Sequence, residues 1–365
     1  MSDIKRIGLV SSLVGSKRPV VYILQDMLKT IGYELNSDGA VGTTTEFIFK
    51  AEQSKLGFSK PDGDWGGGTW TKFLEKYSDV EFNIDPIRLV HEMIAYPETS
   101  SRNAYGFGEN DIGDGAGANY GVLQHNRLGS MKILLKMAGK NHLYTIYCNT
   151  NQYKPDPTIK EWFNSPDGRY WQNEYFKQII WDRSVNQINL INLKFTDPLL
   201  NLRLLGLYCD TQTQNGTMYS SNIGPIAKPD SSINSELYTG TSWDYIFGNY
   251  CTFKELKDVW TQFFNQKTID FSSYGSNKQE KDSKIMTETN IATINYLVNT
   301  AIPEDKPELK LEIIGQYRAR TSNYFYFKDV LSRRNIYAKG KGYMHGDYID
   351  LEQDYSISLI KNFDF

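Results

Sequence analysis

The chain has 365 residues, more than one typical domain, so one large or two unequal domains are expected. Hydrophobic residues make up 40% and aromatic residues 14%, which permits a sizeable core, and the 25 tyrosines are suited to packing on sugar rings. The formal charge of −3, without a basic block, argues against nucleic acid as a partner.

The cysteines and histidines argue against a disulfide framework or a metal site. Cys148, Cys209 and Cys251 are widely spaced and odd in number, and the 4 histidines show no metal-ligand spacing, so no metal and no cofactor are expected. The N-terminus lacks the apolar run and cleavage site of a secretion signal. No apolar stretch approaches the roughly 20 residues of a membrane span. We therefore expect a chain made in the cytoplasm without a membrane span.

Residues 20–76 contain an internal repeat, Asp-Gly-x-x-Gly-x-x-Thr, seen in "DGAVGTTT" from Asp38 and "DGDWGGGT" from Asp62. Each Asp-Gly pair predicts a tight turn, and the threonine is placed to cap the start of a helix. Apolar residues around both turns follow helical spacing. The pattern predicts a three-helix module with two turn motifs.

This segment, "LQDMLKTIGYELNSDGAVGTTTEFIFKAEQSKLGFSKPDGDWGGGTWTKFL", resembles the peptidoglycan-binding module of many cell-wall hydrolases. The matching positions include Gln25, Asp38, Gln53, Asp62 and Trp70. The resemblance implies that residues 1–78 form a domain whose ligand is the peptidoglycan glycan strand. Most of the matching residues specify the fold, and such modules also serve as interaction domains.

The remaining residues, 84–365, follow a boundary near residues 75–85 and have a mainly helical pattern. The predicted fold is mainly α, with the three-helix module followed by a two-lobed α domain and a small β element, near residues 119–124, at the cleft. Helices are predicted at 86–97, 128–138, 172–190, 196–207, 254–265, 285–301, 307–320 and 324–335. Polar segments at 142–170, 210–247 and 266–283 are predicted to be loops.

Two carboxylates match the needs of glycoside hydrolysis, in which one carboxylic acid protonates the leaving oxygen and a second acts on the opposite sugar face. Glu98 ends an apolar helix where Pro97 discourages further helix, and the negative helix end and burial both favour its protonated form. Asp114 lies between Gly113 and Gly115, which allow a sharp turn toward a cleft. Glu98 is therefore the predicted acid and Asp114 the predicted base.

The same stretch, "ETSSRNAYGFGENDIGDGAGANYG", resembles the signature of the family 46 glycoside hydrolases, the chitosanases of the lysozyme superfamily. The resemblance implies that Glu98 is the acid and Asp114 the base of an inverting enzyme. Residues 206–216 and 313–322 and the closing "GYMHGDYIDLEQDYSI" are similar to later parts of that family. The similarity covers most of 84–365 and is sharp around Glu98 and Asp114.

Two positions depart from the family pattern: Ala116 replaces an arginine, and Asn119 replaces a threonine that helps to position the attacking water. The Asn119 amide can still hold a water, so Asn119 is kept as a catalytic candidate. The segment "NYGVLQHN" is similar to lysozymes and lytic transglycosylases, which favours an N-acetylated glycan. The predicted substrate-binding residues are Ser100, Tyr120, Gln124 and Asp210.

Other assignments of these side chains remain open. Glu92 is an alternative acid, because "LVHE" also ends a lysozyme-like helix. Glu109 and Asp111 fit loop solvation or subsite contacts. Asp210 and Arg318 also fit a buried ion pair that shapes the cleft.

The two resemblances agree on a function. We expect a cell-wall glycosidase that hydrolyses β-1,4 bonds of peptidoglycan glycan strands by an inverting acid–base mechanism, acting in the periplasm or outside the cell. Without an export signal, a phage endolysin, a virion-associated lysin or a phage-tail or injection-machine component would each fit. The alternatives are a chitosanase acting on a glucosamine polymer and a catalytically inactive wall-binding or structural component.

Overall fold

The computed structural model describes residues 19–39, 41–99, 105–110, 117–126, 129–149, 153–219, 249–252, 254–255, 258–259, 283–319, 327–344, 347–355 and 363. These residues are mainly helical, which confirms the predicted mainly α class. The chain divides into two compact units, one of Met1–Trp181 with Asp350–Lys361 and one of Asp182–Ile349 with Asn362–Phe365. The predicted boundary at residues 78–84 lies inside the first unit.

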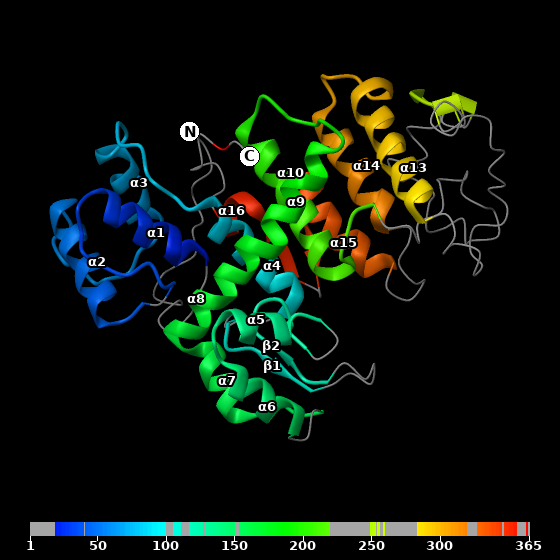
Figure 1. The fold of residues 1–365 in the computed structure, drawn as a ribbon. Helices are drawn as coiled ribbons and strands as arrows, with labels where there is room; N and C mark the ends of the chain where they lie inside the picture. Colours follow the sequence, from blue (N-terminus) through cyan, green and yellow to red (C-terminus); the bar gives the residue numbers. More distant parts are fainter. Residues whose placement is uncertain are drawn as a thin grey trace. The chain divides into compact units, whose positions relative to one another are not determined.

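The first unit begins with the three helices of the repeat segment, α1, α2 and α3, drawn in blue in Figure 1. We call this segment, residues 19–77, the repeat module. A longer helix, α4, follows, and then a short hairpin and further helices. The elements of the unit are α1 (Pro19–Thr30), α2 (Thr43–Lys55), α3 (Gly67–Lys76), α4 (Pro86–Thr99), β1 (Gly108–Glu109), β2 (Asn119–Tyr120), α5 (Met131–Met137), α6 (Asn141–Asn149), α7 (Pro157–Asn164), α8 (Pro166–Tyr175), the π-helical η2 (Phe176–Trp181) and α16 (Leu351–Tyr355).

The first turn of the repeat is built around a buried glutamine on α1. Gln25 accepts a hydrogen bond from the Gly39 amide at 2.8 Å through Oε1. Its Nε2 donates to Asp38 Oδ1 at 3.0 Å and lies 3.3 Å from the Thr45 hydroxyl. Gly39 has φ +69°, a conformation that glycine adopts without the strain of a side chain. The glutamine thus fixes the tight turn that the Asp-Gly pair predicts.

The second turn repeats these contacts around Gln53 on α2. Its Oε1 accepts from the Gly63 amide at 2.8 Å, and its Nε2 donates to Asp62 Oδ1 at 2.8 Å and lies 3.4 Å from the Thr69 hydroxyl. The predicted helix cap is wrong in both copies: the N-cap is a glycine, Gly66 here, and no side chain caps the helix. The threonine hydroxyl instead meets the glutamine, because it lies one turn inside the helix.

Aromatic side chains fill the core of the repeat module. Trp65 and Trp70 are both fully buried, with ring centroids 6.1 Å apart, and Phe49 and Phe73 lie 5.1 and 5.2 Å from Trp65. These rings stabilise the module by burial and edge-to-face contacts. The two tryptophans are therefore core residues and are not available to stack on a sugar.

The region 142–170 is not the loop that its Pro, Ser and Asn content predicted. It contains most of α6, all of α7 and the start of α8. Asp156 accepts hydrogen bonds from the first-turn amides of α7, and Ser165 accepts one from the first turn of α8. Each cap is followed by a proline, which at the first helical position supports a helix start. The composition that suggested a loop belongs to two helix N-termini.

The second unit is a helical group with one two-stranded sheet, β3–β4, near the chain's end. Its α10 was predicted to end at residue 207, but it continues to a C-cap at Gly216, whose φ is +77°. In Figure 1, α14 and α15 lie side by side, consistent with their extensive packing. The elements are α9 (Asp182–Asn189), α10 (Pro198–Asn215), α13 (Ser283–Tyr296), the π-helical η6 (Leu297–Ala301), α14 (Pro307–Ala319), α15 (Phe327–Lys339), β3 (Lys341–Met344) and β4 (Asp347–Asp350).

Most other predicted elements are present with shifted ends. The prediction for 172–190 corresponds to α8, η2 and α9 in succession, and that for 285–301 corresponds to α13 and η6. The predicted strand at 119–124 is shorter, because β2 ends at Tyr120 and a turn follows. Most of the helix predicted at 254–265 and nearly all of the loop predicted at 266–283 lie outside the described residues.

Candidate active site

The last turn of α4 carries Glu98, the predicted acid. Asp85 starts this helix by accepting a hydrogen bond from the Ile87 amide at 3.0 Å. The helix was predicted to end at residue 97, but it extends to Thr99, so Pro97 lies within its last turn. The Thr99 hydroxyl donates to a carbonyl of the preceding turn at 2.7 Å, which supports this end of the helix. Glu98 itself is half-buried.

A short antiparallel hairpin follows α4, with Glu109 of β1 opposite Asn119 of β2. After β2 the chain turns sharply, and Gln124 has the positive φ of +51° that few non-glycine residues adopt. The Gln124 side-chain amide donates a hydrogen bond to the backbone carbonyl of Glu98. The residues after the hairpin are therefore attached directly to the helix end that carries the predicted acid.

The two β2 residues of the predicted site are both buried. Asn119 accepts a hydrogen bond from Asn126 Nδ2 at 3.0 Å through its Oδ1, so its Nδ2 group is the side that could hold a water. Tyr120 is 1% exposed, and its hydroxyl accepts from the Asp156 amide at 2.6 Å. Its ring stacks on Phe163 at 5.5 Å between centroids. Tyr120, predicted to bind substrate, is a core residue in this structure.

The remaining predicted residues of this region lie outside the described residues. They are Ser100, Asp111, Asp114 and Ala116. In the sequence, Asp114 belongs to the connection between β1 and β2. Glu109, on β1, is exposed, which fits both solvation and a subsite contact.

A glutamine that the sequence reasoning missed fixes the turn after β2. Gln172 of α8 is fully buried, and its Oε1 accepts from the Val122 amide at 3.0 Å. Its Nε2 donates to the Phe163 carbonyl at 2.9 Å. Gly121, with φ +70°, packs so closely that an added Cβ would lie 2.2 Å from Gln172 Oε1. The available sequence signal was this glycine, which marks a close approach of the backbone to another element.

Asp210 lies on α10 in the second unit, where it is fully buried. Its carboxylate forms ion pairs with the guanidinium groups of Arg333 and Arg334, both on α15. Arg334 also donates to Gln214 Oε1 at 2.8 Å. The predicted buried ion-pair role of Asp210 thus agrees with the structure, in which these two arginines are its partners. The side chain of Arg318, the predicted partner, lies outside the described residues. The burial of Asp210 argues against its predicted contact with substrate.

Glu92, the alternative acid, is buried in the middle of α4 with 4% of its surface exposed. Burial raises the pKa of its carboxyl to about 8, and a hydrogen bond with Tyr105 and the charge of Arg88 oppose that rise. Its Oε1 atom has no hydrogen-bond partner. A buried carboxyl in this setting is held mainly in its neutral form at pH 7.

A hydrogen-bond network continues from Glu92. Tyr105 donates its hydroxyl proton to Asn173 Oδ1 at 2.7 Å, and His91 Nδ1 lies 2.7 Å from the same oxygen. Because that oxygen is an acceptor, His91 carries its proton on Nδ1. The His91 ring stacks on Phe176 at 4.5 Å, and burial lowers its pKa to about 4. Tyr105 and Asn173 were not predicted from the sequence, because no local pattern indicates that two residues so far apart in the chain are in contact.

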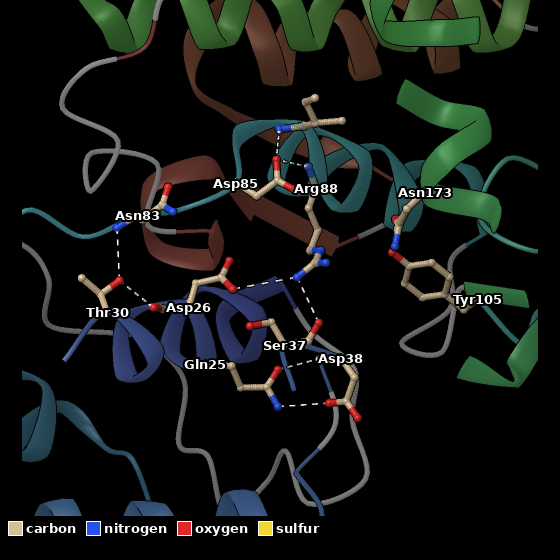
Figure 2. Close-up of polar contacts among 12 residues, drawn as sticks. Gln25, Asp26, Thr30, Ser37, Asp38, Asn83, Asp85, Arg88, Tyr105 and Asn173 are labelled. Carbon is tan, nitrogen blue, oxygen red and sulfur yellow. Dashed lines mark hydrogen bonds and ion pairs between the residues drawn. The ribbon is translucent and has the colours of Figure 1, made fainter. Parts of the chain in front are cut away.

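The N-terminal half of α4 is attached to the repeat module (Figure 2). Arg88 donates through Nη1 to the Ser37 carbonyl at 3.0 Å and lies 3.9 Å from Asp26 Oδ1. Its guanidinium also covers the Tyr22 ring at 4.8 Å. A small pocket lies here, lined by residues of α1 and by Ile84, Asp85, Arg88, Leu89 and Glu92. We call this set of contacts the α1–α4 joint.

Comparison with protein-family models, with curated proteins and with solved structures finds no match to this chain. The two resemblances therefore rest on the quoted motifs. None of the helices that the structure describes is long and apolar enough to cross a bilayer. Within the same described residues, no group of three or more His, Cys, Asp or Glu side chains is arranged to hold a metal ion.

Proposed function

We propose that this chain is a glycoside hydrolase that cleaves β-1,4 bonds of peptidoglycan glycan strands, with Glu98 as the general acid and Asp114 as the base. The observation that carries the proposal is the hydrogen bond from Gln124 to the Glu98 carbonyl. It attaches the helix end that bears the acid to the hairpin whose connecting segment contains Asp114. A glycosidase needs such a fixed relation between its two carboxylates.

In this mechanism Glu98 protonates the glycosidic oxygen as the bond to the sugar breaks. Asp114 takes a proton from a water that attacks the opposite face, which inverts the configuration. Inversion requires the two carboxyl groups to lie roughly 6.5–9.5 Å apart, so that the water fits between them. The Asn119 Nδ2 group is the candidate to orient this water, because Asn126 already contacts its Oδ1.

The position of Glu92 supports Glu98 as the acid. Successive helical residues are rotated by about 100°, so two residues six positions apart point roughly 120° away from each other. Glu92 faces the α1–α4 joint and is buried there, whereas Glu98 is half-buried at the helix end. This difference in placement favours Glu98 over Glu92 as the acid.

The repeat module supports the choice of substrate. Its two Gln-held turns and aromatic core give a compact structure with the motif that resembles a peptidoglycan-binding module. Binding of the module to an insoluble polymer raises the effective concentration of substrate for the hydrolase.

Digestion of purified sacculi and, separately, of chitosan tests this function. The proteins are wild type, Glu98→Gln, Asp114→Asn and the control Glu109→Gln, which changes an exposed glutamate on β1 of the same hairpin. Mass spectrometry of the released fragments identifies the cleaved bond and the configuration at the new end. We expect sacculus cleavage by wild type and Glu109→Gln, and a loss of at least about a thousandfold in the other two variants.

Each alternative has its own outcome. Cleavage of sacculi that survives Glu98→Gln contradicts the assignment of the acid. Cleavage of chitosan alone identifies a chitosanase. Binding to sacculi without release of fragments from either polymer identifies a wall-binding component.

A further inference from the structure

We infer that the α1–α4 joint is proton-dependent: the repeat module stays packed on α4 while the Glu92 carboxyl is neutral, and the joint loosens when that carboxyl ionises. This inference goes beyond the proposed function and does not depend on it. It concerns how the first unit holds its own helices together, and it can be tested without any substrate.

The geometry around Glu92 favours a neutral carboxyl. Tyr105 has a single hydroxyl proton, and it is donated to Asn173 Oδ1 at 2.7 Å, although the same hydroxyl is also within hydrogen-bond reach of Glu92. An ionised Glu92 therefore has to compete with Asn173 for this one proton, whereas a neutral carboxyl does not depend on it. The other Glu92 oxygen, Oε1, is buried without a hydrogen-bond partner, which is costly for an ion and far less so for a neutral acid.

The nearest cation does not neutralise an ionised Glu92 within the joint. Arg88 is directed to the Ser37 carbonyl and toward Asp26 on the repeat-module side (Figure 2). Turning its guanidinium toward Glu92 would give up the contacts that hold the module on α4. An ionised Glu92 therefore either lacks a close cation or competes with Ser37 and Asp26 for the Arg88 guanidinium.

Other titratable groups around the joint do not replace Glu92 in this role. Burial raises the pKa of Tyr22 and of Tyr105, so both phenols remain neutral when Glu92 ionises. Burial also raises the pKa of Asp26 above the ordinary value of 3.8, but a hydrogen bond with Ser37 and the charge of Arg88 oppose the rise. The titratable or charged groups on the described parts of the elements packed here are Tyr22, Asp26 and exposed Lys29 of α1, Asp85, Arg88, His91 and Glu98 at or on α4, Tyr105 before β1, exposed Lys177 of η2, and Glu352 and Tyr355 of α16.

The joint also contains a hydrogen-bonded backbone amide, whose exchange rate reports whether the joint is closed or open. The Asn83 amide, just before α4, donates to the Thr30 hydroxyl at the end of α1 at 3.3 Å. Figure 2 shows this contact beside the Asp26–Arg88 pair. The Gly63 amide, bound to Gln53 within the module, does not take part in the joint and serves as an internal control.

The test is hydrogen–deuterium exchange of the full chain at about pH 6 and about pH 9, with rates corrected for intrinsic exchange. Wild type is compared with Glu92→Gln, which keeps the size of the side chain but cannot ionise. Because the carboxyl has a pKa of about 8 in the joint and an ordinary value once exposed, the opening equilibrium should increase on the order of a hundredfold over this range. Faster exchange is expected at Asn83 and in α1 and α4, but not at Gly63.

Two further variants test whether Glu92 is the group that controls the opening. Asp26→Asn removes another carboxyl of the joint and should retain the alkaline opening. Tyr105→Phe removes a group that lowers the Glu92 pKa in the joint, so the increase in opening between pH 6 and pH 9 should be larger than in wild type. Equal exchange in wild type and Glu92→Gln at both pH values overturns the inference, as does an alkaline opening that disappears in Asp26→Asn.

Discussion

The side-chain amide of Gln124 donates a hydrogen bond to the backbone carbonyl of Glu98, at the last turn of α4. A carbonyl at a helix C-terminus has no partner within the helix, so a side chain can satisfy it. This contact lets one glutamine fix both the helix end and the turn after the hairpin. Gln124 was predicted to bind substrate, and in the structure its side-chain amide makes this positioning contact.

Replacement of Gln124 by Ala should therefore lower activity through the position of Glu98. A displacement of about 1 Å at a catalytic group can lower the rate on the order of a hundredfold, so we expect a loss of 10- to 100-fold in kcat with little change in KM. Sacculus turnover measured as dye release gives both constants. The control Gln178→Ala changes an exposed glutamine of η2 and should leave them unaltered. An unchanged kcat in Gln124→Ala would contradict the positioning role.

Gly39 and Gly57 provide a matched pair in the repeat module. Both have positive φ, +69° and +80°, but a Cβ at Gly39 would lie 2.3 Å from the Tyr22 ring, whereas nothing lies within 4 Å of one at Gly57. Gly57→Ala should cost about 1 kcal/mol from backbone strain alone. Gly39→Ala should cost roughly 3 kcal/mol, because overpacking against Tyr22 is added. Urea unfolding midpoints measure both free energies, and equal losses would show that Tyr22 moves aside.

Local sequence signals predicted the repeat module well. The Asp-Gly pairs at Asp38 and Asp62 form the predicted tight turns, which glycine's backbone freedom allows, so the pattern was sufficient for the turns but not for the helix caps. The same rules failed at 142–170, where Asp156 and Ser165 each precede a proline and start a helix. Helix N-termini and loops are rich in the same residue types. Only the spacing of the apolar residues that follow distinguishes a helix start from a loop.

Contacts between distant residues could not be predicted in the same way. Asp210 was expected to pair with Arg318, whose side chain lies outside the described residues, and its ion pairs with Arg333 and Arg334 were not predicted. Charge identifies an arginine as a partner without selecting which one, because the selection depends on how α10 and α15 pack. The burial of Glu92 likewise depends on α1, which no spacing within α4 reveals.

The stability of the chain should be highest near pH 6.5, because two kinds of buried group act in opposite directions. The pKa of His91 is lowered to about 4 and that of His125 to about 3 by burial, so their contribution is present above pH 6.5 and lost as the pH falls. The pKa of Glu92 is raised to about 8, so its contribution is present below its unfolded value and lost as the pH rises toward 8.

Urea unfolding between about pH 4 and pH 9 measures both limbs of this profile. Replacement of His91 by Gln should flatten the acid limb, which for this residue amounts to roughly 3 kcal/mol. Glu92→Gln should flatten the alkaline limb and make the acid limb steeper, because the Glu92 contribution already falls above its unfolded pKa of about 4.5. The exposed His142 on α6 supplies the control, since His142→Gln should preserve the profile. A wild-type stability that rises steadily to pH 9 would contradict the role of Glu92.

Asp210 should be among the residues most important for the stability of the second unit. Its carboxylate lies between two arginines that are 3% and 0% exposed in their side chains, so removing it leaves two buried cations without this partner. Asp210→Ala should cost about 3–5 kcal/mol, the usual loss when one member of a buried ion pair is removed. Glu308→Ala is the control, because Glu308 pairs with Arg203 at 3.2 Å but is 62% exposed, and surface pairs contribute about 1 kcal/mol or less. Chemical denaturation measures the free energy of unfolding of both variants. Similar decreases in that free energy would show that water or a rearrangement of the two arginines compensates for the missing Asp210 carboxylate.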